Sequence, residues 1–542
     1  MAEAFMRHTV RWLSVAAVVL ARPLAAQHEH EHSTGQLGRV VFPISCNAAA
    51  QQQFERAMTM LHSFWWEEGQ GAFQAVATAD SSCAMAYWGL ALNAWGNPFA
   101  GGAPPTSEST RRGAAAAQRA VALGALTKRE QGFLAAAAAL YRGYDSIPNP
   151  RRLRAYSDTL ARLYADFPDD VEVAIYYALS LVATAPKTDT TFTRQKQAAA
   201  ILNPLFRRFP NHPGLAHYII HANDSPRLAP LGLEAARSYA KIAPAAPHAQ
   251  HMPSHIFVRL GLWDETIATN QRAFQAGYDY ARAQHTGVAP EQLHALDYMV
   301  YAYLQQGHDR DARRIIAQAL ELQTTLTSDA MVANYNRVAM EARWPLERGD
   351  WADAARLPVR AAPLTIGAAL AHFARGVGAA RESDTAQARA EIAALAGIAA
   401  DMTRRGDSDW ARVVAIKQQI VTAWAELAAG DTTAALRDAK AAADVEDVTE
   451  KQPVTPGELL PARELYADML AQVSRNAEAR DAYEATLLRE PNRARSLYGS
   501  ARAAELAGDR AGARRRYAEF LAQMRAGDGD RAEITRARAA LR

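Results

Sequence analysis

Histidines gather in one part of this 542-residue chain, which has only 15 in all. His248, His251 and His255 lie within eight residues, His217 and His221 precede them, and His294 follows them. Imidazole nitrogen suits zinc, copper and iron, and a zinc or copper site needs three or four nitrogen or oxygen donors at about 2.0–2.2 Å. The six histidines, together with Asp224, are therefore candidate ligands of a divalent metal.

The spacing of His217 and His221 predicts that they act as a pair. They are four residues apart in a segment expected to be helical over 214–222, so their rings project from one face. Asp224 follows at the helix end and is a candidate third ligand. Tyr218 stands where a zinc protease of the His-Glu-x-x-His type has its glutamate, so that motif is absent.

Pro253 leaves two alternatives for the other three histidines. A helix that starts at Pro247 places all three on one face. Because a proline inside a helix costs about 3 kcal/mol, the helix starts at Pro253 in the second alternative, and His248 and His251 then lie on the incoming loop. Both alternatives keep the three rings close together.

The cluster permits three interpretations. A metal bound there with an open coordination position would support hydrolytic or redox chemistry, and a filled site would be structural. Without a metal, the same side chains form a polar site for a peptide or small molecule. In the third interpretation they bond to loop backbone and pack against Tyr218, Phe257 and Trp263. The chain has no nucleophile elbow, phosphate-binding glycine loop or dinucleotide fingerprint, which argues against serine hydrolase, nucleoside triphosphatase and Rossmann chemistry.

Two further sets of residues are candidates for a partner or ligand groove. Trp65, Trp66 and Glu67 stand at an expected turn between helices. The tryptophans either pack between two hairpins or form a groove patch with the carboxylate. Asp297 and Tyr301 follow His294 by three and seven residues, so the three side chains share a helix face.

The N-terminus is typical of an exported protein. Arg7 and Arg11 precede an apolar run at 13–21, and small residues end at Ala26, which predicts a signal peptide over 1–26. We expect a periplasmic or secreted bacterial protein without a transmembrane segment after cleavage. Removal of residues 1–26, with three arginines and one glutamate, lowers the net charge from +3 to about +1, which lacks the electrostatic footprint of nucleic-acid binding.

The mature chain is expected to begin with a flexible, His-rich segment over 27–46. Its alternating histidine and glutamate residues have no helical or strand periodicity. The chain has two cysteines, Cys46 and Cys83. In an oxidising location an isolated pair predicts a disulfide.

The elements that position these residues are expected to be helices throughout. No segment alternates with the period of a strand, so the sequence predicts an all-α fold. Degenerate helical hairpins are expected over 47–240, a central region with the histidines over 241–345, and more regular repeats over 346–542. In the last region, Ala479 to Tyr483 and Ala513 to Tyr517 repeat the same small-to-aromatic spacing 34 residues apart.

These repeats resemble the tetratricopeptide repeat family, whose unit is a 34-residue helix-turn-helix. The resemblance implies a right-handed α-solenoid with a concave groove lined by first helices, and a scaffold that binds a protein or peptide. His251 to His255 and the stretch from His294 to Tyr303 also resemble a branch of exported bacterial tetratricopeptide proteins. In such an array the histidines of three successive hairpins would form a ladder across the groove. The alternative is a metal-dependent enzyme, with zinc, copper or iron, that uses the cluster as its active site.

Overall fold

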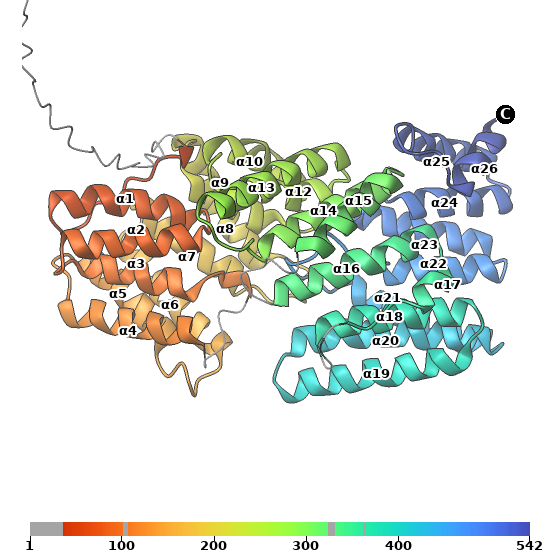
Figure 1. Ribbon diagram of the computed structural model, residues 1–542, viewed down its shortest axis with the longest axis horizontal. Coiled ribbons are helices and arrows are strands. Elements are labelled where there is room, and N and C mark those ends of the chain that lie inside the picture. Colours follow the sequence, from red (N-terminus) through yellow and green to blue (C-terminus); the bar gives the residue numbers. More distant parts are fainter. Residues whose placement is uncertain (1–35, 101–106, 323–330, 361, 363–364) are drawn as a thin grey trace, which may run out of the picture. The chain divides into compact units, whose positions relative to one another are not determined.

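The computed structural model describes residues 36–100, 107–322, 331–360, 362 and 365–542, and these form helices without a strand (Figure 1). The N-terminal helices are α1 Ala48–His62, α2 Trp66–Ala79, α3 Ala84–Trp95, α4 Glu108–Leu123, α5 Lys128–Tyr141, α6 Asn149–Asp166, α7 Val171–Ala183, α8 Thr193–Arg208, α9 Pro213–Asn223 and α10 Ala229–Ile242. The first histidines of the cluster lie on α9.

The later helices carry the rest of the cluster and the C-terminal repeats. The central ones are α11 Pro247–His251, α12 Pro253–Arg259, α13 Trp263–Ala283, α14 Glu291–Gln305, α15 Asp309–Leu322, α16 Met331–Arg348 and α17 Trp351–Ala355. The C-terminal ones are α18 Ile366–Arg381, α19 Thr385–Arg404, α20 Ser408–Ala428, α21 Thr432–Asp447, α22 Ala462–Gln472, α23 Asn476–Arg489, α24 Ala494–Leu506, α25 Arg510–Gln523 and α26 Ala532–Leu541.

Helices pack mainly against their neighbours in the chain, as pairs such as α1 with α2, α18 with α19 and α24 with α25. The turns between pairs follow from sequence. Gly430 and Gly508 end helices with φ angles of 90° and 84°, which glycine adopts without strain. The next residues, Asp431 and Asp509, accept hydrogen bonds from the first turns of α21 and α25. The prediction of an all-α solenoid of stacked helix-turn-helix hairpins is confirmed for the described residues.

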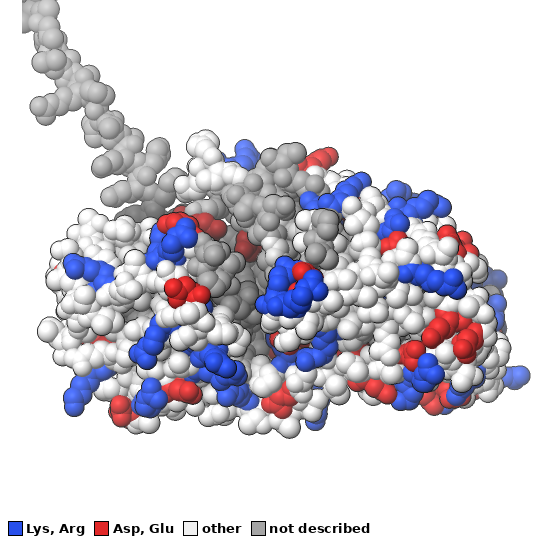
Figure 2. Space-filling model, turned by 90° about the horizontal axis from the view of Figure 1, so that it is seen from below, with Lys and Arg blue, Asp and Glu red and all other residues white. Residues whose placement is uncertain are grey.

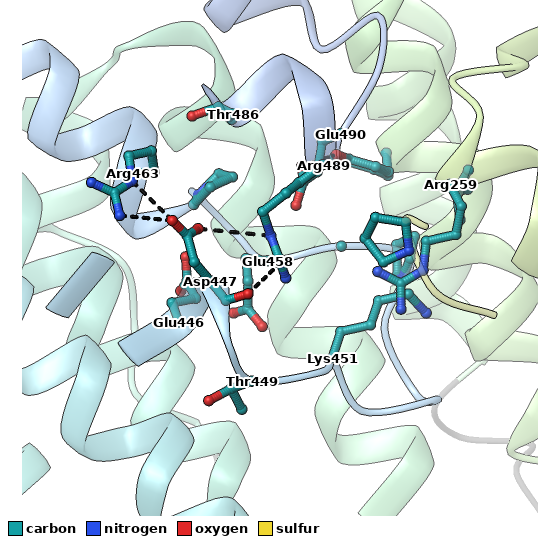
Figure 3. A pocket seen from close by; sticks show the side chains of 16 residues that line it. Arg259, Glu446, Asp447, Thr449, Lys451, Glu458, Arg463, Thr486, Arg489 and Glu490 are labelled. Carbon is teal, nitrogen blue, oxygen red and sulfur yellow. Dashed lines mark hydrogen bonds and ion pairs between the residues drawn. The ribbon is translucent and has the colours of Figure 1, made fainter. Parts of the chain in front are cut away.

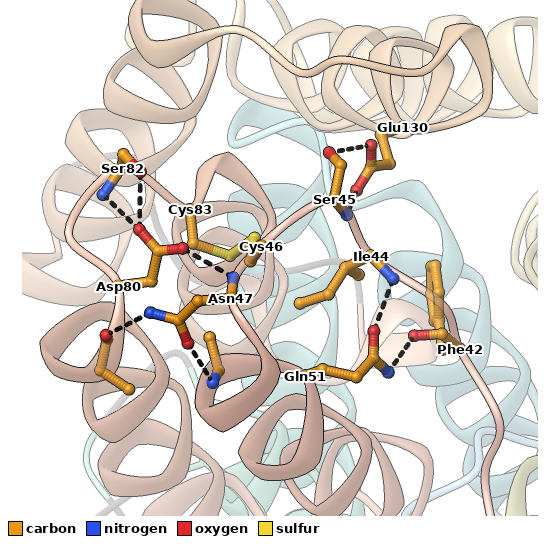
Figure 4. Close-up of a disulfide and its surroundings, with 12 residues drawn as sticks. Phe42, Ile44, Ser45, Cys46, Asn47, Gln51, Asp80, Ser82, Cys83 and Glu130 are labelled. Carbon is orange, nitrogen blue, oxygen red and sulfur yellow. Dashed lines mark hydrogen bonds between the residues drawn. A yellow bond between two sulfur atoms is a disulfide. The ribbon is translucent and has the colours of Figure 1, made fainter.

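The segment before α1 is firmly packed. Leu37 and Phe42 are buried, and Ser45 binds Glu130 of α5 through its main-chain N–H (2.7 Å) and its hydroxyl (2.5 Å) (Figure 4). The predicted flexibility of 27–46 is therefore wrong for residues 36–46, because apolar side chains and backbone hydrogen bonds fix them. Residues 27–35, like the predicted signal peptide 1–26, lie outside the described residues.

A disulfide joins Cys46 to Cys83 beside this segment (Figure 4). It lies next to the N-cap of α1, where the side chain of Asn47 accepts from the N–H of Ala50 and its own main-chain N–H donates to Asp80 (2.9 Å). The disulfide therefore ties the start of α1 to the start of α3.

The described residues belong to one compact unit, within which helices of the three regions predicted at 47–240, 241–345 and 346–542 pack against one another. The largest apolar core runs from Leu37 to Phe257 and includes the first histidine-bearing helices. Acidic and basic side chains are interspersed over the face seen in Figure 2. Within the described part, no helix is long and apolar enough to span a membrane.

Hairpins far apart in sequence also touch one another. The indole N–H of Trp263, at the start of α13, donates to the carbonyl of Asn492 (3.1 Å), and the side chain of Gln305 accepts from the N–H of Ala494 (2.9 Å). The C-terminal hairpins thus pack against α13 and α14, and the array is more than a chain of nearest neighbours.

Candidate metal centre

The six central histidines separate into two triads, each contributed by neighbouring hairpins. In each triad the candidate ligand atoms all lie within 4.8 Å of one another. The first triad comprises His217 and His221 of α9 and His248 of α11. The second triad comprises His251 of α11, His255 of α12 and His294 of α14.

The two prolines decide how the middle histidines are aimed. Pro247 and Pro253 each take the first position of a short helix, so α11 ends at His251 and α12 starts two residues later. Both alternatives drawn from the sequence were partly right, since a helix starts at each proline. Of the three histidines at 248–255, His248 belongs to the first triad, and His251 and His255 belong to the second. The two triads adjoin, because ring centroids are 6.0 Å apart for His221 and His255 and 6.1 Å apart for His248 and His251.

In the first triad the Nε2 atoms converge. Nε2 of His217 lies 3.1 Å from Nε2 of His221 and 3.2 Å from Nε2 of His248. Two nitrogens bound to one tetrahedral zinc ion lie about 3.3–3.4 Å apart, so this spacing suits a shared metal. Nδ1 of His217 lies 2.6 Å from the carbonyl of His62 and must donate to it. The lone pair of His217 is therefore on Nε2, facing the other two rings.

The second triad has the same arrangement, with Nε2 of His251 3.1 Å from Nε2 of His255. Nδ1 of His251 donates to Oδ1 of Asn270 (2.6 Å), whose amide is fixed by donation to the carbonyl of Thr266 (2.8 Å). Nδ1 of His255 donates to the carboxylate of Asp224 (2.9 Å). Two Nε2 lone pairs thus face each other without a proton between them.

The third member of the second triad is also placed for ligation. The ring centroid of His294 is 4.4 Å from that of His251, and its ligand atom lies within 4.8 Å of those of His251 and His255. Tyr298 packs on all three rings of this triad, with centroid distances of 4.9, 5.4 and 5.0 Å. Its hydroxyl donates to the carbonyl of Thr455 (3.3 Å).

Burial keeps these imidazoles neutral. Removal from water is the largest cause that lowers the pKa of each of the six rings below the ordinary value of 6.5. Neighbouring imidazoles lower the pKa further in five of the rings, whereas the pKa of His255 is raised by Asp224 and lowered by Lys451 and Arg259, with a net shift downward. A neutral imidazole is the form that binds a metal. Protons therefore compete weakly for these nitrogens at neutral pH.

Asp224 has a different role from the predicted one. It is not among the grouped ligand atoms, because its Oδ2 accepts from Nδ1 of His255 and its Oδ1 accepts from Nε of Arg259 (2.9 Å). Lys451 lies 3.5 Å from the same carboxylate. The structure therefore places Asp224 behind His255, where these cations and the imidazole occupy both of its oxygens and it orients the ring of His255.

A third cluster, formed by His62, His212 and Glu172, is explained without a metal. The two oxygens of Glu172 each accept one Nε2–H, from His62 (3.0 Å) and His212 (2.8 Å). Burial alone would raise the pKa of Glu172, but the two imidazoles outweigh it and lower the pKa. Nδ1 of His62 accepts from the hydroxyl of Tyr218 (3.1 Å). The carboxylate oxygens of Glu172 and both ring nitrogens of His62 are thereby satisfied, and only Nδ1 of His212 has no partner among the described residues.

An open pocket of about 250 Å³ leads to both triads. Its lining includes His248 of the first triad, and His251 and His294 of the second. Trp65, Trp66 and Glu67 line the same pocket, so the structure places these three predicted groove residues beside the histidines.

Asp297 and Tyr301 lie elsewhere. Asp297 is fully buried and accepts from Nε of Arg343 (2.9 Å), so its prediction as a groove residue was wrong: the face of α14 that carries it is covered by α16. Tyr301 is also buried, and it lines a separate pocket of about 40 Å³ among the charged side chains of Figure 3. Its hydroxyl donates to Glu490 (3.1 Å). The sequence gives no sign of these partners, which are distant in the chain.

Two residues of the site have no clear signal in the sequence. Asn270 is one buried amide within a long amphipathic helix. Phe64 has a φ angle of 52°, which costs a non-glycine residue about 1–2 kcal/mol. Its ring lies 4.4 Å from that of His217 and 5.4 Å from that of His248. Strained residues of this kind gather at functional sites, but the strain is visible only in coordinates.

No protein-family model matches the sequence, and no curated protein matches it. Among solved structures, yeast Tom70 is similar over 91% of this chain and 95% of its own, with 12% identity and a TM-score of 0.33. The human IFIT1 dimer with m7Gppp-AAAA is similar over 81% of this chain and 90% of its own, with 10% identity and a TM-score of 0.35. TM-scores this low establish no common partner.

Proposed function

We propose that this protein binds two metal ions side by side, one in each histidine triad, and exposes them to the pocket beside Trp65 and Trp66. The observation that carries the proposal is the pair of Nε2 lone pairs on His251 and His255, 3.1 Å apart in a buried site. Two neutral acceptors this close repel each other, and the one donor near them, the hydroxyl of Tyr298, is shared between Nε2 of His255 (3.5 Å) and the carbonyl of Thr455 (3.3 Å). A cation between them turns the repulsion into two ligand bonds.

The donor set favours a transition metal such as zinc, copper or iron. Each triad offers three neutral imidazoles, and none of the grouped ligand atoms in either triad is a carboxylate oxygen. Imidazole suits zinc, copper, iron and nickel, whereas magnesium, calcium and manganese prefer oxygen. Three protein ligands on each ion leave a position open toward the pocket, which is the arrangement of catalytic sites. The metal-dependent enzyme is thus the favoured form of this proposal.

The helical array would serve as the rigid carrier of this centre in a periplasmic or secreted protein. The disulfide of Cys46 and Cys83 supports an exported location, since disulfides persist in oxidising compartments. A protein or peptide partner for the array stays a prediction.

Metal analysis tests the proposal. The chain is produced without a tag and with residues 27–32 deleted, because the imidazoles of His28, His30 and His32 would compete for the added metal. It is incubated with zinc or copper, freed of unbound metal, and analysed by mass spectrometry of the elements. We expect two equivalents of metal per chain, one equivalent in His217→Gln and in His251→Gln, and almost none in the double variant.

The matched control is His308→Gln, which removes a histidine outside both triads and should keep two equivalents. Circular dichroism verifies that every variant is folded. Less than one equivalent in the unmutated chain under all loading conditions would falsify the proposal, as would two equivalents retained by the double variant.

A further inference from the structure

The pocket above the triads has a polarity that points to its ligand. Its carboxylates are Glu67, at the start of α2, and Glu291, at the start of α14. No lysine or arginine lines it. Burial raises the pKa of Glu291, the nearby Glu67 raises it further, and no cationic side chain opposes this shift. Negative charge is therefore uncompensated at this opening, in contrast to the paired charges of the pocket in Figure 3, where Asp447 lies between Arg463 and Arg489.

Aromatic rings form much of the remaining wall. Phe64 and Trp66 are stacked with centroids 4.7 Å apart, and Trp65 meets Tyr280 edge to face at 5.3 Å. Phe64 also stacks on His248, with ring centroids 5.4 Å apart, so the aromatic wall is continuous with the first triad. Aromatic faces attract both flat rings and cations, the latter through the ring quadrupole.

The volume limits the size of the ligand. An apolar cavity of about 150 Å³ holds a benzene molecule. The pocket of about 250 Å³ therefore has room for one aromatic ring with a short side chain. The lining includes His248 of the first triad and His251 and His294 of the second, so one end of such a molecule would lie beside the proposed metal centre.

We propose that this pocket binds a small arylalkylammonium ion, with its ring against Phe64, Trp65 and Trp66 and its ammonium group at Glu67 and Glu291. Cation–π attraction and the two carboxylates select a protonated amine over a neutral or anionic molecule of the same shape. The proposal deepens the proposed function by naming a ligand for the open face of the metal centre. Only the contact between ligand and metal rests on that function, since the aromatic rings and the two carboxylates are present whether or not a metal is bound.

Binding measurements on the full chain test this inference, with phenethylammonium as the probe. Tryptophan fluorescence and calorimetry are recorded on metal-free and metal-loaded protein. We expect saturable binding to both forms, and binding of 2-phenylethanol and of phenylacetate at least about tenfold weaker, because a hydrogen bond to a charged group is lost or opposed. Equal binding of phenylacetate, or no binding of the amine, overturns the inference.

Variants separate the two parts of the site. The Glu67→Gln/Glu291→Gln double variant should lose about tenfold or more in affinity for the amine while its affinity for 2-phenylethanol is unchanged. Glu234→Gln, on α10 and outside the pocket, is the matched control and should bind as the unmutated chain does. An unchanged affinity for the amine in the double variant contradicts the inference.

The two proposals fail separately. If the chain takes up no metal but binds the amine, the metal centre is wrong and the cation pocket holds. If two metals bind and the amine does not, the cation pocket is wrong and the metal centre holds.

Discussion

The histidines of the centre depend on the atoms that hold their second ring nitrogen. Nδ1 of His251 donates to Asn270, and the amide of Asn270 is fixed by Thr266 of the same helix. Loss of such a partner commonly lowers metal affinity by about 10- to 100-fold. We predict this loss at the second triad for Asn270→Leu, measured by competition with a chelator.

Asn270→Asp is the matched variant, because its carboxylate accepts the same Nδ1–H and makes the imidazole more basic. We expect it to keep the affinity of the second triad, and both variants to leave the first triad unchanged. If aspartate and leucine weaken the site equally, the orienting hydrogen bond is not what the metal requires.

The residue types of the centre were predictable, but their partners were not. The spacing of His217 and His221 placed two rings on one helix face, and the prolines marked where short helices begin. Asn270 lies 19 residues after His251, on the next long helix, and His62, whose carbonyl accepts from His217, lies 155 residues before that histidine. A periodicity argument cannot reach such contacts, because they depend on how hairpins pack.

At the scale of elements, close approach of α9 to α1 positions the first triad. Gly214 of α9 has no side chain, and an added Cβ would lie 2.5 Å from Nδ1 of the buried His62, whose carbonyl holds His217. We predict that Gly214→Ala lowers the free energy of unfolding by about 1–3 kcal/mol, as overpacking does, and weakens metal binding at the first triad.

Gly71 of α2 provides the control, since an added Cβ there would meet nothing within 4 Å. Gly71→Ala should stabilise the protein by about 0.5–1 kcal/mol through its helix propensity. Thermal unfolding of both variants measures the difference. A Gly214→Ala variant as stable as the unmutated protein would show that the two helices separate easily.

The hairpin of α18 and α19 has a pH-dependent link. Glu391 accepts from Nδ1 of His372 and from Nε of Arg375, both at 2.6 Å. Burial raises the pKa of Glu391, but these partners outweigh it and lower the pKa below the ordinary 4.5. A carboxylate with a lowered folded-state pKa stabilises the fold above the unfolded pKa, and this contribution disappears as pH falls through the folded pKa.

We therefore predict that Glu391→Gln lowers the stability by about 1–3 kcal/mol at pH 7, where a charged hydrogen-bond acceptor is lost. The difference from the unmutated protein should shrink as pH falls below 4.5, in melting curves recorded across that range. A difference that is independent of pH would mean that the lost packing, and not the charge, is responsible.

At the scale of the molecule, the C-terminal half reaches the metal centre through the irregular segment 449–461 between α21 and α22. Thr455 of this segment accepts from Tyr298, and Lys451 lies beside Asp224. The repeat spacing predicted the hairpins on both sides of this segment. It could not predict the contact with the centre, because nothing in a 34-residue period specifies which distant turn an irregular segment meets.

Arg343 of α16 holds the segment in place. It is fully buried and paired with Asp297, and it donates to the hydroxyl of Thr455 (2.9 Å) and to the carbonyls of Gly457 (2.8 Å) and Glu458 (3.0 Å). Removal of one partner from a buried ion pair commonly costs about 3–5 kcal/mol, because the other charge stays buried. We predict a loss of this size for Arg343→Met, with new protease cleavage between residues 449 and 461.

The same variant should weaken the second triad although it alters none of its histidines, since Tyr298 and Asp224 lose the segment that supports them. Arg343→Met/Asp297→Asn removes the unpaired charge and should recover part of the stability but not the resistance to protease. Arg356→Met breaks an exposed pair with Asp353 and should cost less than about 1 kcal/mol. If Arg343→Met left both the cleavage pattern and the metal affinity unchanged, the C-terminal hairpins would stand beside the centre without supporting it.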